Sequence, residues 1–343
     1  MQTLKSEAAS AIDRLAHAQN IVVVCHFDPD GDAIGSLLGL GLALRAMDKA
    51  VVLACDDPVP WNLTFLPGSD TVVQALPPGA FDLAVVVDSS DARRVGRVGA
   101  EAMARGAPLI NIDHHVTNTR FGQVNVVDPD AASASEIVYN LLRAMGHALD
   151  ADTATCLLTG LVTDTRGFRT ANVNQRVLRT AADLMDAGAP LATITQLALD
   201  RRSFSALAMM GRALDKVRFE DGVIWSAMDL DEIRALDTNG TGARPRNISS
   251  LLNAVDGANV AVFFAEKPDG AVDISMRAKP GFDLTALYDE GQALHQQGGG
   301  HPLASGAEVN APLATVVSQV VDALKALVRE QTQARETAAD LSR

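Results

Sequence analysis

The sequence has little cysteine and few aromatic residues. Its 343 residues include three cysteines, Cys25, Cys55 and Cys156, which lie far apart in apolar segments. This spacing argues against a disulfide framework and against a zinc site built from thiolates. We therefore interpret the three thiols as buried core residues.

Long apolar runs are also absent. No run reaches the roughly 18 apolar residues that a membrane span needs, and the first 20 residues carry acidic side chains without an apolar signal core. The sequence therefore predicts a cytoplasmic protein with no membrane partner. Its 48% hydrophobic and 21% charged residues are typical of a globular chain, and its length favours two domains.

Basic side chains are fewer than acidic ones. The 29 Lys and Arg residues face 42 Asp and Glu residues, for a net charge of −13. Because phosphate contacts dominate nucleic-acid affinity, this charge argues against a long duplex as substrate. Part of the acidic excess could instead bind cations, which would turn it into a site for anions.

Short apolar runs in the first half indicate buried strands, at 21–25, 51–55, 83–88 and 109–113. They alternate with helical segments, a pattern that predicts an α/β fold with a parallel sheet covered on both faces. One helix is expected to begin near Gly35. Another is expected at Ser133, which has capping-box spacing to Glu136, and a third leads into Asp164.

The pattern changes after residue 188. A helical stretch at 203–218 is followed by two apolar pairs around Asp-Gly turns, which predict hairpins in a mixed α/β domain. A last helical segment begins near Ala311, and its polar end is expected to fray. We expect a catalytic domain at 1–188, a helical linker at 189–214, a smaller substrate-binding domain at 215–330 and a tail at 331–343.

A dense group of polar residues follows the first predicted strand. The segment CHFDPDGDAIGS holds His26, Asp28, Asp30 and Asp32, at the edge where open α/β sheets build their sites. Three carboxylates so close repel one another unless cations or protons offset their charge. Histidine and aspartate without thiolate favour Mn²⁺ or Mg²⁺. The alternative is a solvated loop, because the same residues are good turn formers.

Further acidic and histidine residues follow other elements, namely Asp88, Asp113, His114, His115 and Asp164. Taken singly, each has an ordinary interpretation as a helix cap, a surface histidine or a loop residue. The ends of parallel strands, however, meet at one edge of a sheet. The pattern as a whole therefore predicts a shared site.

The motifs resemble those of the DHH phosphoesterases. The resemblance rests on the order of the acidic and histidine motifs described above, together with Gly298-Gly299-Gly300-His301 and Ser305-Gly306 in the second half of the chain. The resemblance is to the two-domain DHH/DHHA1 branch, which includes nano-RNases with 3′-phosphoadenosine-5′-phosphate phosphatase activity, and it spans nearly the whole chain. It implies a DHH catalytic domain, a DHHA1 domain and an active site in the cleft between them. One departure is Gln297, where the family often has a fourth glycine.

The resemblance also implies two divalent cations, with Mn²⁺ preferred and Mg²⁺ possible. The first set of expected ligands is His26, Asp30 and Asp88. The second set is Asp32, Asp88, His114 and Asp164, so that Asp88 bridges. Two cations that share a carboxylate can activate water and stabilise the charge on phosphoryl oxygens.

Other residues receive supporting or catalytic roles. Asp113 would orient its neighbours, as partners of metal-binding histidines do, and His115 would act near the phosphate as a donor or general acid. With Asp88, these are the expected catalytic residues. Asp28 has two interpretations, a turn residue or a residue that supports the ligands.

The second domain would hold the substrate. Gly298, Gly299 and Gly300 allow close approach of an anionic ligand, and His301 can donate to a phosphate or base. Arg277 resembles the family's substrate-holding arginine, and Ser305 belongs to the same motif. The alternatives are a flexible glycine loop and a solvated arginine at a strand end.

The implied function is hydrolysis of short oligoribonucleotides to mononucleotides, with removal of the 3′-phosphate from 3′-phosphoadenosine-5′-phosphate as a second activity. A phosphodiesterase of cyclic or linear dinucleotides is an alternative that the sequence does not exclude. A non-catalytic nucleotide-binding module is another, although every expected ligand position is filled. A homodimer is expected from the family.

Overall fold

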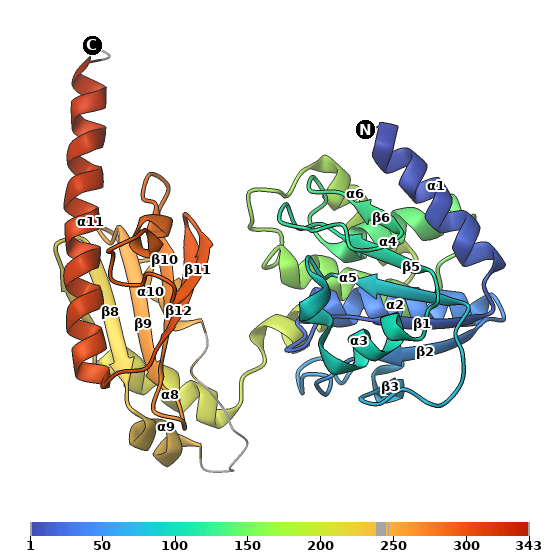
Figure 1. The fold of residues 1–343 in the computed structure, drawn as a ribbon, viewed down its shortest axis with the longest axis horizontal. Coiled ribbons are helices and arrows are strands. Elements are labelled where there is room, and N and C mark those ends of the chain that lie inside the picture. Colours follow the sequence, from blue (N-terminus) through green and yellow to red (C-terminus); the bar gives the residue numbers. More distant parts are fainter. Residues whose placement is uncertain (1, 238–244, 246, 342–343) are drawn as a thin grey trace. The chain divides into compact units, whose positions relative to one another are not determined.

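The computed structural model describes residues 2–237, 245 and 247–341. The chain forms two compact units, Met1–Arg201 and Arg202–Arg343, and their boundary falls within the predicted linker 189–214 (Figure 1). Each unit has its own six-stranded sheet and its own core.

The first unit is built on a parallel sheet with the strand order β3-β2-β1-β4-β5-β6. Its strands are β1 Asn20–Val24, β2 Ala50–Ala54, β3 Val72–Val73, β4 Leu83–Val87, β5 Leu109–Asp113 and β6 Val124–Val127. All four predicted strands are confirmed to within one residue. The short edge strands β3 and β6 were not predicted. The strand order reverses between β1 and β4, which is where α/β sheets of this kind bind ligands.

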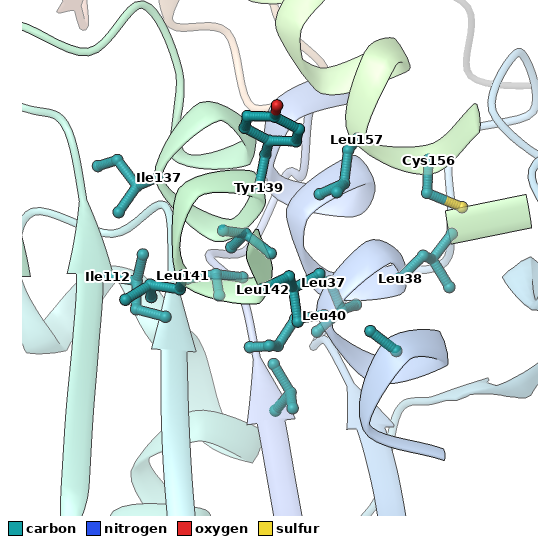
Figure 2. Packing of buried hydrophobic residues seen from close by; sticks show 14 of the residues in the cluster. Leu37, Leu38, Leu40, Ile112, Ile137, Tyr139, Leu141, Leu142, Cys156 and Leu157 are labelled. Atoms are coloured by element: carbon teal, nitrogen blue, oxygen red, sulfur yellow. The ribbon is translucent and has the colours of Figure 1, made fainter. Parts of the chain in front are cut away.

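Helices cover both faces of this sheet. They are α1 Gln2–His17, α2 Gly31–Ala46, α3 Gly96–Ala104, α4 Ala134–Ala144, α5 Ala151–Asp164, α6 Gln175–Asp186 and α7 Leu191–Ile194. Alternate residues of β1 point to opposite faces. Figure 2 shows part of the core formed with α2, α4 and α5. Val23 belongs to this core, whereas Val22 and Val24 pack with Val98 of α3.

The start of α2 differs from the prediction. It begins at Gly31 rather than near Gly35, because Asp30 caps it: one carboxylate oxygen accepts hydrogen bonds from the backbone N–H groups of Asp32 at 3.0 Å and Ala33 at 3.1 Å. Asp32 therefore lies in the first turn of a helix and not in a loop. The expected helix from Ser133 is confirmed, with Ser133 as its cap.

Glycines let α2 and α5 approach closely. A Cβ on Gly35 would lie 2.6 Å from the carbonyl oxygen of Cys156 and 2.8 Å from the nitrogen of Gly160. A Cβ on Gly160 would in turn lie 2.6 Å from an oxygen of Asp32. This contact therefore sets the depth at which Asp32 is buried.

The second unit has a mixed sheet with the order β11-β12-β10-β9-β8-β7. Its strands are β7 Arg218–Glu220, β8 Val223–Met228, β9 Val260–Glu266, β10 Val272–Ala278, β11 Gly298–His301 and β12 Ala304–Val309. Both predicted hairpins, β7–β8 and β9–β10, are confirmed, and β8 pairs with β9 in parallel. The glycine segment is an edge strand paired with β12, so the alternative interpretation as a flexible loop is wrong.

The helices of this unit are α8 Phe204–Asp215, α9 Leu230–Leu236, α10 Ile248–Leu252 and α11 Leu313–Leu341. Residues of α11 pack on one face of the sheet and residues of α8, α9 and α10 on the other. α11 continues through most of the segment expected as a tail, 331–343. Within the described residues, no helix has the length and hydropathy to span a membrane.

We predict that Gly35→Val destabilises the first unit, because the branched side chain of valine cannot be placed against the backbone of α5. Overpacking of this kind costs on the order of 1–3 kcal/mol. The matched control is Gly211→Val in α8, where a Cβ would meet no atom within 4 Å. Urea unfolding in a chelating buffer measures both variants, and an unchanged midpoint for Gly35→Val would show that α5 moves away at no cost.

Candidate metal centre

The structure brings together all six residues that were expected to bind metal. His26 and Asp30 follow β1, Asp88 follows β4 and His114 follows β5. Asp32 lies in α2, and Asp164 is the last residue of α5. Two groups that share no member have ligand atoms within 4.8 Å of one another: His26, Asp30 and Asp88 in one, and Asp32, His114 and Asp164 in the other. A third group, Asp88, Asp113, His114 and His115, overlaps both.

Asp88 belongs to the first group and also lies close to His114 of the second. Its Oδ2 is 3.6 Å from Nε2 of His26, and its Oδ1 is 3.5 Å from Nε2 of His114. The residue is buried and its φ is +53°, an uncommon backbone conformation for a side chain other than glycine. Its N–H donates to the carbonyl of Ile112 on β5 at 2.9 Å, which holds the turn in place.

The residues present fit divalent cations. Oδ1 of Asp88 is buried and has no hydrogen-bond partner in the described part of the chain. An unsatisfied buried carboxylate oxygen is costly, and a cation would satisfy it. Carboxylate oxygens and imidazole nitrogens without thiolate are the donors that Mn²⁺ and Mg²⁺ accept.

His26 is oriented by its own loop. Its Nδ1 donates to the carbonyl of Phe27 at 2.7 Å, so that Nε2 faces Asp88. This backbone contact selects the tautomer that a metal ligand needs. Burial opposes protonation of the ring, but the Asp88 carboxylate outweighs it and raises the pKa of His26 to about 9.

Asp32 is held by the first turn of α4. Its Oδ2 accepts from the N–H of Ala134 at 2.5 Å, and its Oδ1 accepts from the N–H of Ser135 at 2.9 Å. The positive end of a helix dipole thus faces this buried carboxylate. Nε2 of His114 lies 3.9 Å from Asp32 Oδ2 and 3.5 Å from Asp164 Oδ2.

Charged side chains in and next to the second group shift one another's pKa values. Burial opposes protonation of His114, but Asp88 and Asp32 outweigh it and raise the pKa of His114 to about 10. Burial raises the pKa of Asp164 to about 6, although His114 acts in the opposite direction. Burial also opposes ionisation of Asp88, yet the flanking imidazoles hold its pKa well below the ordinary value. Such strongly perturbed groups are typical of functional sites.

Asp113 supports the cluster through hydrogen bonds to neighbouring side chains. Its Oδ1 accepts from Nδ1 of His115 at 2.7 Å, and its Oδ2 accepts from Nδ2 of Asn118 at 2.5 Å. The hydrogen bond to Asp113 raises the pKa of His115, whose side chain is 36% exposed. Both Asp113 oxygens are therefore engaged in holding neighbouring side chains.

Two features of the site were not predicted. Asn118 also donates to Asn111 Oδ1 at 2.8 Å and to the carbonyl of Ser89 at 3.1 Å, so it links its own loop to β5 and to the loop after β4. A signal was present in the sequence, since Asn118 closely follows the two histidines. The other feature is the contact of Asp32 with α4, which needs the three-dimensional fold.

Asp28 is placed as a turn residue. Its φ is +47°, and its backbone N–H donates to Asp57 Oδ2 at 2.6 Å. It does not belong to either group of ligand atoms found among the described residues. The geometry agrees with the turn interpretation.

In the second unit, Arg277 of β10 is in register with Ala304 of β12, which is in register with His301 of β11. Arg277 and His301 thus share one cross-strand row. Ser305 is the next position along and pairs with Met276, so its side chain points to the opposite, buried face. The structure does not bring the Ser305 hydroxyl together with Arg277.

The glycines of β11 have different reasons for lacking a side chain. A Cβ on Gly298 would lie 2.2 Å from the carbonyl oxygen of Gly306, and one on Gly300 would lie 2.6 Å from that of Ala304. A Cβ on Gly299 would meet nothing within 4 Å. Gly298 and Gly300 are thus needed for strand pairing, whereas Gly299 leaves an open backbone surface.

Comparison with known proteins decides the family. A model of the DHH family N-terminal domain matches residues 20–161, and a model of the DHHA1 domain matches residues 231–332. The bifunctional oligoribonuclease and PAP phosphatase NrnA of Thermus thermophilus is 38% identical over 290 residues, covering 84% of this chain and 83% of the relative. The chain belongs to the DHH family.

Other DHH-family comparisons agree. The bifunctional oligoribonuclease and PAP phosphatase NrnA of Bacillus subtilis is 28% identical over 84% of this chain and 89% of its own. The crystal structure of an exopolyphosphatase-related protein from Bacteroides fragilis has a TM-score of 0.85 at 24% identity, covering 96% of this chain and 98% of that one. The latter likeness shows the shared fold.

We predict a pH-dependent stability of the metal-free protein. The pKa values of His26 and His114 rise from 6.5 to about 9 and about 10 in the folded chain. The stability that these rings contribute is complete below pH 6.5 and is lost as the pH rises through 9 to 10. In chelator, the melting temperature should therefore fall between pH 7 and 9.5. The fall should be smaller for His114→Gln than for His17→Gln, whose ring is exposed.

The protons on His26 and His114 compete with metal ions for the same ring nitrogens. Imidazole must be neutral to bind a cation, so loading should release protons and apparent affinity should increase over this pH range. Titration calorimetry of Mn²⁺ in buffers of different ionisation enthalpy measures the release. A binding heat that does not depend on the buffer would contradict the assignment of these rings.

Proposed function

We propose that this chain hydrolyses short oligoribonucleotides to mononucleotides and removes the 3′-phosphate from 3′-phosphoadenosine-5′-phosphate. As a DHH-family member it is a metal-dependent phosphoesterase. The observation that carries the proposal is the shared position of Asp88 between two groups of ligand atoms. The names of the relatives support the substrate class, and so does the acidic net charge, which disfavours long polyanions.

Two divalent cations, Mn²⁺ in preference to Mg²⁺, would supply Lewis acidity toward the phosphoryl oxygens. In this proposal one is held by His26, Asp30 and Asp88. The other is held by Asp32, Asp88, His114 and Asp164. Asp88 positions both groups relative to each other, because its two oxygens face different histidines.

His115 is the proposed proton donor to the leaving oxygen. Asp113 binds Nδ1 of its ring at 2.7 Å and favours the protonated form. The opposite nitrogen, Nε2, is then the atom that can donate toward a substrate. Asp113 and Asn118 fix the orientation of this ring and do not touch the substrate.

The second unit is proposed to hold the substrate away from the reacting bond. Arg277 can offer two parallel N–H groups to a phosphate, and His301 lies in the same cross-strand row. The open backbone at Gly299 permits close approach. For Ser305 we propose only support of this edge, through its pairing with Gly300. The expected cleft, homodimer and cytoplasmic location stay predictions.

A substrate panel tests the proposal. Purified protein with Mn²⁺ should hydrolyse pApA, a five-residue RNA and 3′-phosphoadenosine-5′-phosphate faster than cyclic di-AMP or pyrophosphate. Preference for cyclic di-AMP would favour the dinucleotide alternative. Nucleotide binding without any turnover would favour the non-catalytic module.

Asp88→Ala should abolish turnover of every substrate, because both proposed sets of metal ligands include this carboxylate. The matched control is Asp91→Ala, which removes an acid that pairs with Arg93 on the surface. Rates and bound Mn²⁺ should be measured together. Near-normal activity of Asp88→Ala would disprove the bridging role.

Arg277→Ala should separate binding from chemistry. The loss of a charge-assisted contact worth roughly 1.5–3 kcal/mol should lower kcat/KM for a short RNA about 10- to 150-fold. Hydrolysis of bis-(p-nitrophenyl) phosphate, which has no second phosphate, should hardly change. The exposed Arg218→Ala serves as control. If Arg277→Ala lowers the hydrolysis of both substrates equally, the proposal that Arg277 binds a second phosphate is wrong.

A further inference from the structure

One face of the second sheet changes character between β9 and β10. On β9, Ala261 and Phe263 belong to an apolar cluster with residues of α10. On β10, the residues in register with them are Arg277 and Ser275. Apolar packing therefore ends at β9, and the same face continues with polar side chains.

The strands beyond β10 leave this face almost bare next to Ser275. Ser275 pairs with Gly306 of β12, and Gly306 pairs with Gly299 of β11. A Cβ on Gly299 would meet nothing within 4 Å. This row lies two residues from the row of Arg277 and His301, and residues two apart in a strand point to the same face. Ser275 and Arg277 thus face the same side, roughly 6.6 Å apart along the strand.

The hydroxyl of Ser275 is held by one neighbour. Its Oγ lies 2.9 Å from Oγ of Ser249 in α10, and either oxygen can be the donor. Two hydroxyls carry two protons, and the hydrogen bond between them uses one. Neither hydroxyl has a second partner in the part of the chain that the structure describes. Because Ser249 is 2% exposed and Ser275 is half-buried, Ser275 is the one that can bind a ligand.

A neutral hydroxyl beside a phosphate-binding arginine suits a sugar. The phosphate that Arg277 can bind away from the reacting bond is the 5′-phosphate, which pApA and 3′-phosphoadenosine-5′-phosphate both carry. In both, the 3′-oxygen of the same nucleotide carries the phosphate to be cleaved. The 2′-hydroxyl is therefore the one free hydroxyl of this sugar. It is also shared by every ribonucleotide, whatever the base, and it can donate and accept.

We propose that the Ser275 hydroxyl binds the 2′-hydroxyl of the nucleotide whose 5′-phosphate lies on Arg277, and that this contact selects ribonucleotides. The separation of the two side chains along β10 is comparable to the span from a 5′-phosphate to the 2′-hydroxyl of one nucleotide. This inference rests on the proposed function and deepens it, because it names the sugar that the second unit recognises. Both proposed substrates carry the group and should respond alike.

The kinetic test pairs each substrate with its 2′-deoxy counterpart. Wild type should hydrolyse pApA with a kcat/KM about 3- to 10-fold above that of pdApA, which lacks the 2′-hydroxyl of the first nucleotide and hence one neutral hydrogen bond. Ser275→Ala should lower kcat/KM for pApA by the same factor and leave that for pdApA within about 1.5-fold. The bisphosphate and its 2′-deoxy analogue should give the same ratios.

Two controls separate this contact from an effect on folding or on the metals. Ser318→Ala removes an exposed hydroxyl from α11, which packs on the opposite face of the same sheet, and should change neither ratio. Bis-(p-nitrophenyl) phosphate has no sugar, so wild type and Ser275→Ala should hydrolyse it equally.

A binding measurement provides a readout without turnover. In a chelating buffer, the full chain is titrated by calorimetry with 3′-phosphoadenosine-5′-phosphate and with its 2′-deoxy analogue. Wild type should bind the ribonucleotide about 3- to 10-fold more tightly. Ser275→Ala should bind the two with equal affinity.

The outcomes distinguish this inference from the proposed function. If wild type does not discriminate between ribose and deoxyribose, or if Ser275→Ala lowers kcat/KM for both by the same factor, the contact is wrong. Turnover of pApA with a ribose preference that survives Ser275→Ala would agree with the proposed function and overturn the inference. A ribose preference in binding that depends on Ser275, in a protein that hydrolyses neither substrate, would support the inference and contradict the proposed function.

Discussion

The buried carboxylate of Asp88 is the constraint around which the first unit is organised. A charge at this depth needs compensation, and two imidazoles within 3.6 Å provide it from opposite sides. The imidazoles are protonated without metal and would be neutral with it, so cations and protons compensate the same carboxylates in turn. A divalent ion bound here would therefore replace protons in offsetting the buried negative charge.

The scaffold supplies this arrangement through helix ends and close helix contacts. Asp30 caps α2, and Asp32, two residues further on, accepts hydrogen bonds from two N–H groups at the start of α4. A glycine at position 160 leaves room for the Asp32 carboxylate. Asp32 is thus fixed by backbone groups of another element, whereas Asp30 and His26 are fixed by backbone groups close to them in sequence.

The second unit uses a different principle. Its sheet places Arg277 and His301 in one row across three strands, while Gly298 and Gly300 are used for pairing. These groups can donate hydrogen bonds to anions but offer no cluster of carboxylates for cations. In the proposed function, chemistry and substrate holding therefore fall to separately folded units.

Local patterns in the sequence were sufficient for the four central strands, for both hairpins and for the expectation that His26, Asp30, Asp32, Asp88, His114 and Asp164 lie together. Apolar runs and turn chemistry act over a few residues, and parallel strands end at a common edge. The assignment of these six residues as metal ligands came from the family resemblance. Contacts between distant segments decided the rest. The start of α2 depends on how Asp30 is turned, the glycine segment became a strand because β12 lies beside it, and the side chain of Ser305 was assigned to the buried face by register. Asn118 joins loops that are far apart in sequence, and Arg94 meets His26 only after β1 and β4 become neighbours. Long-range packing sets these positions, and residue type alone does not encode it.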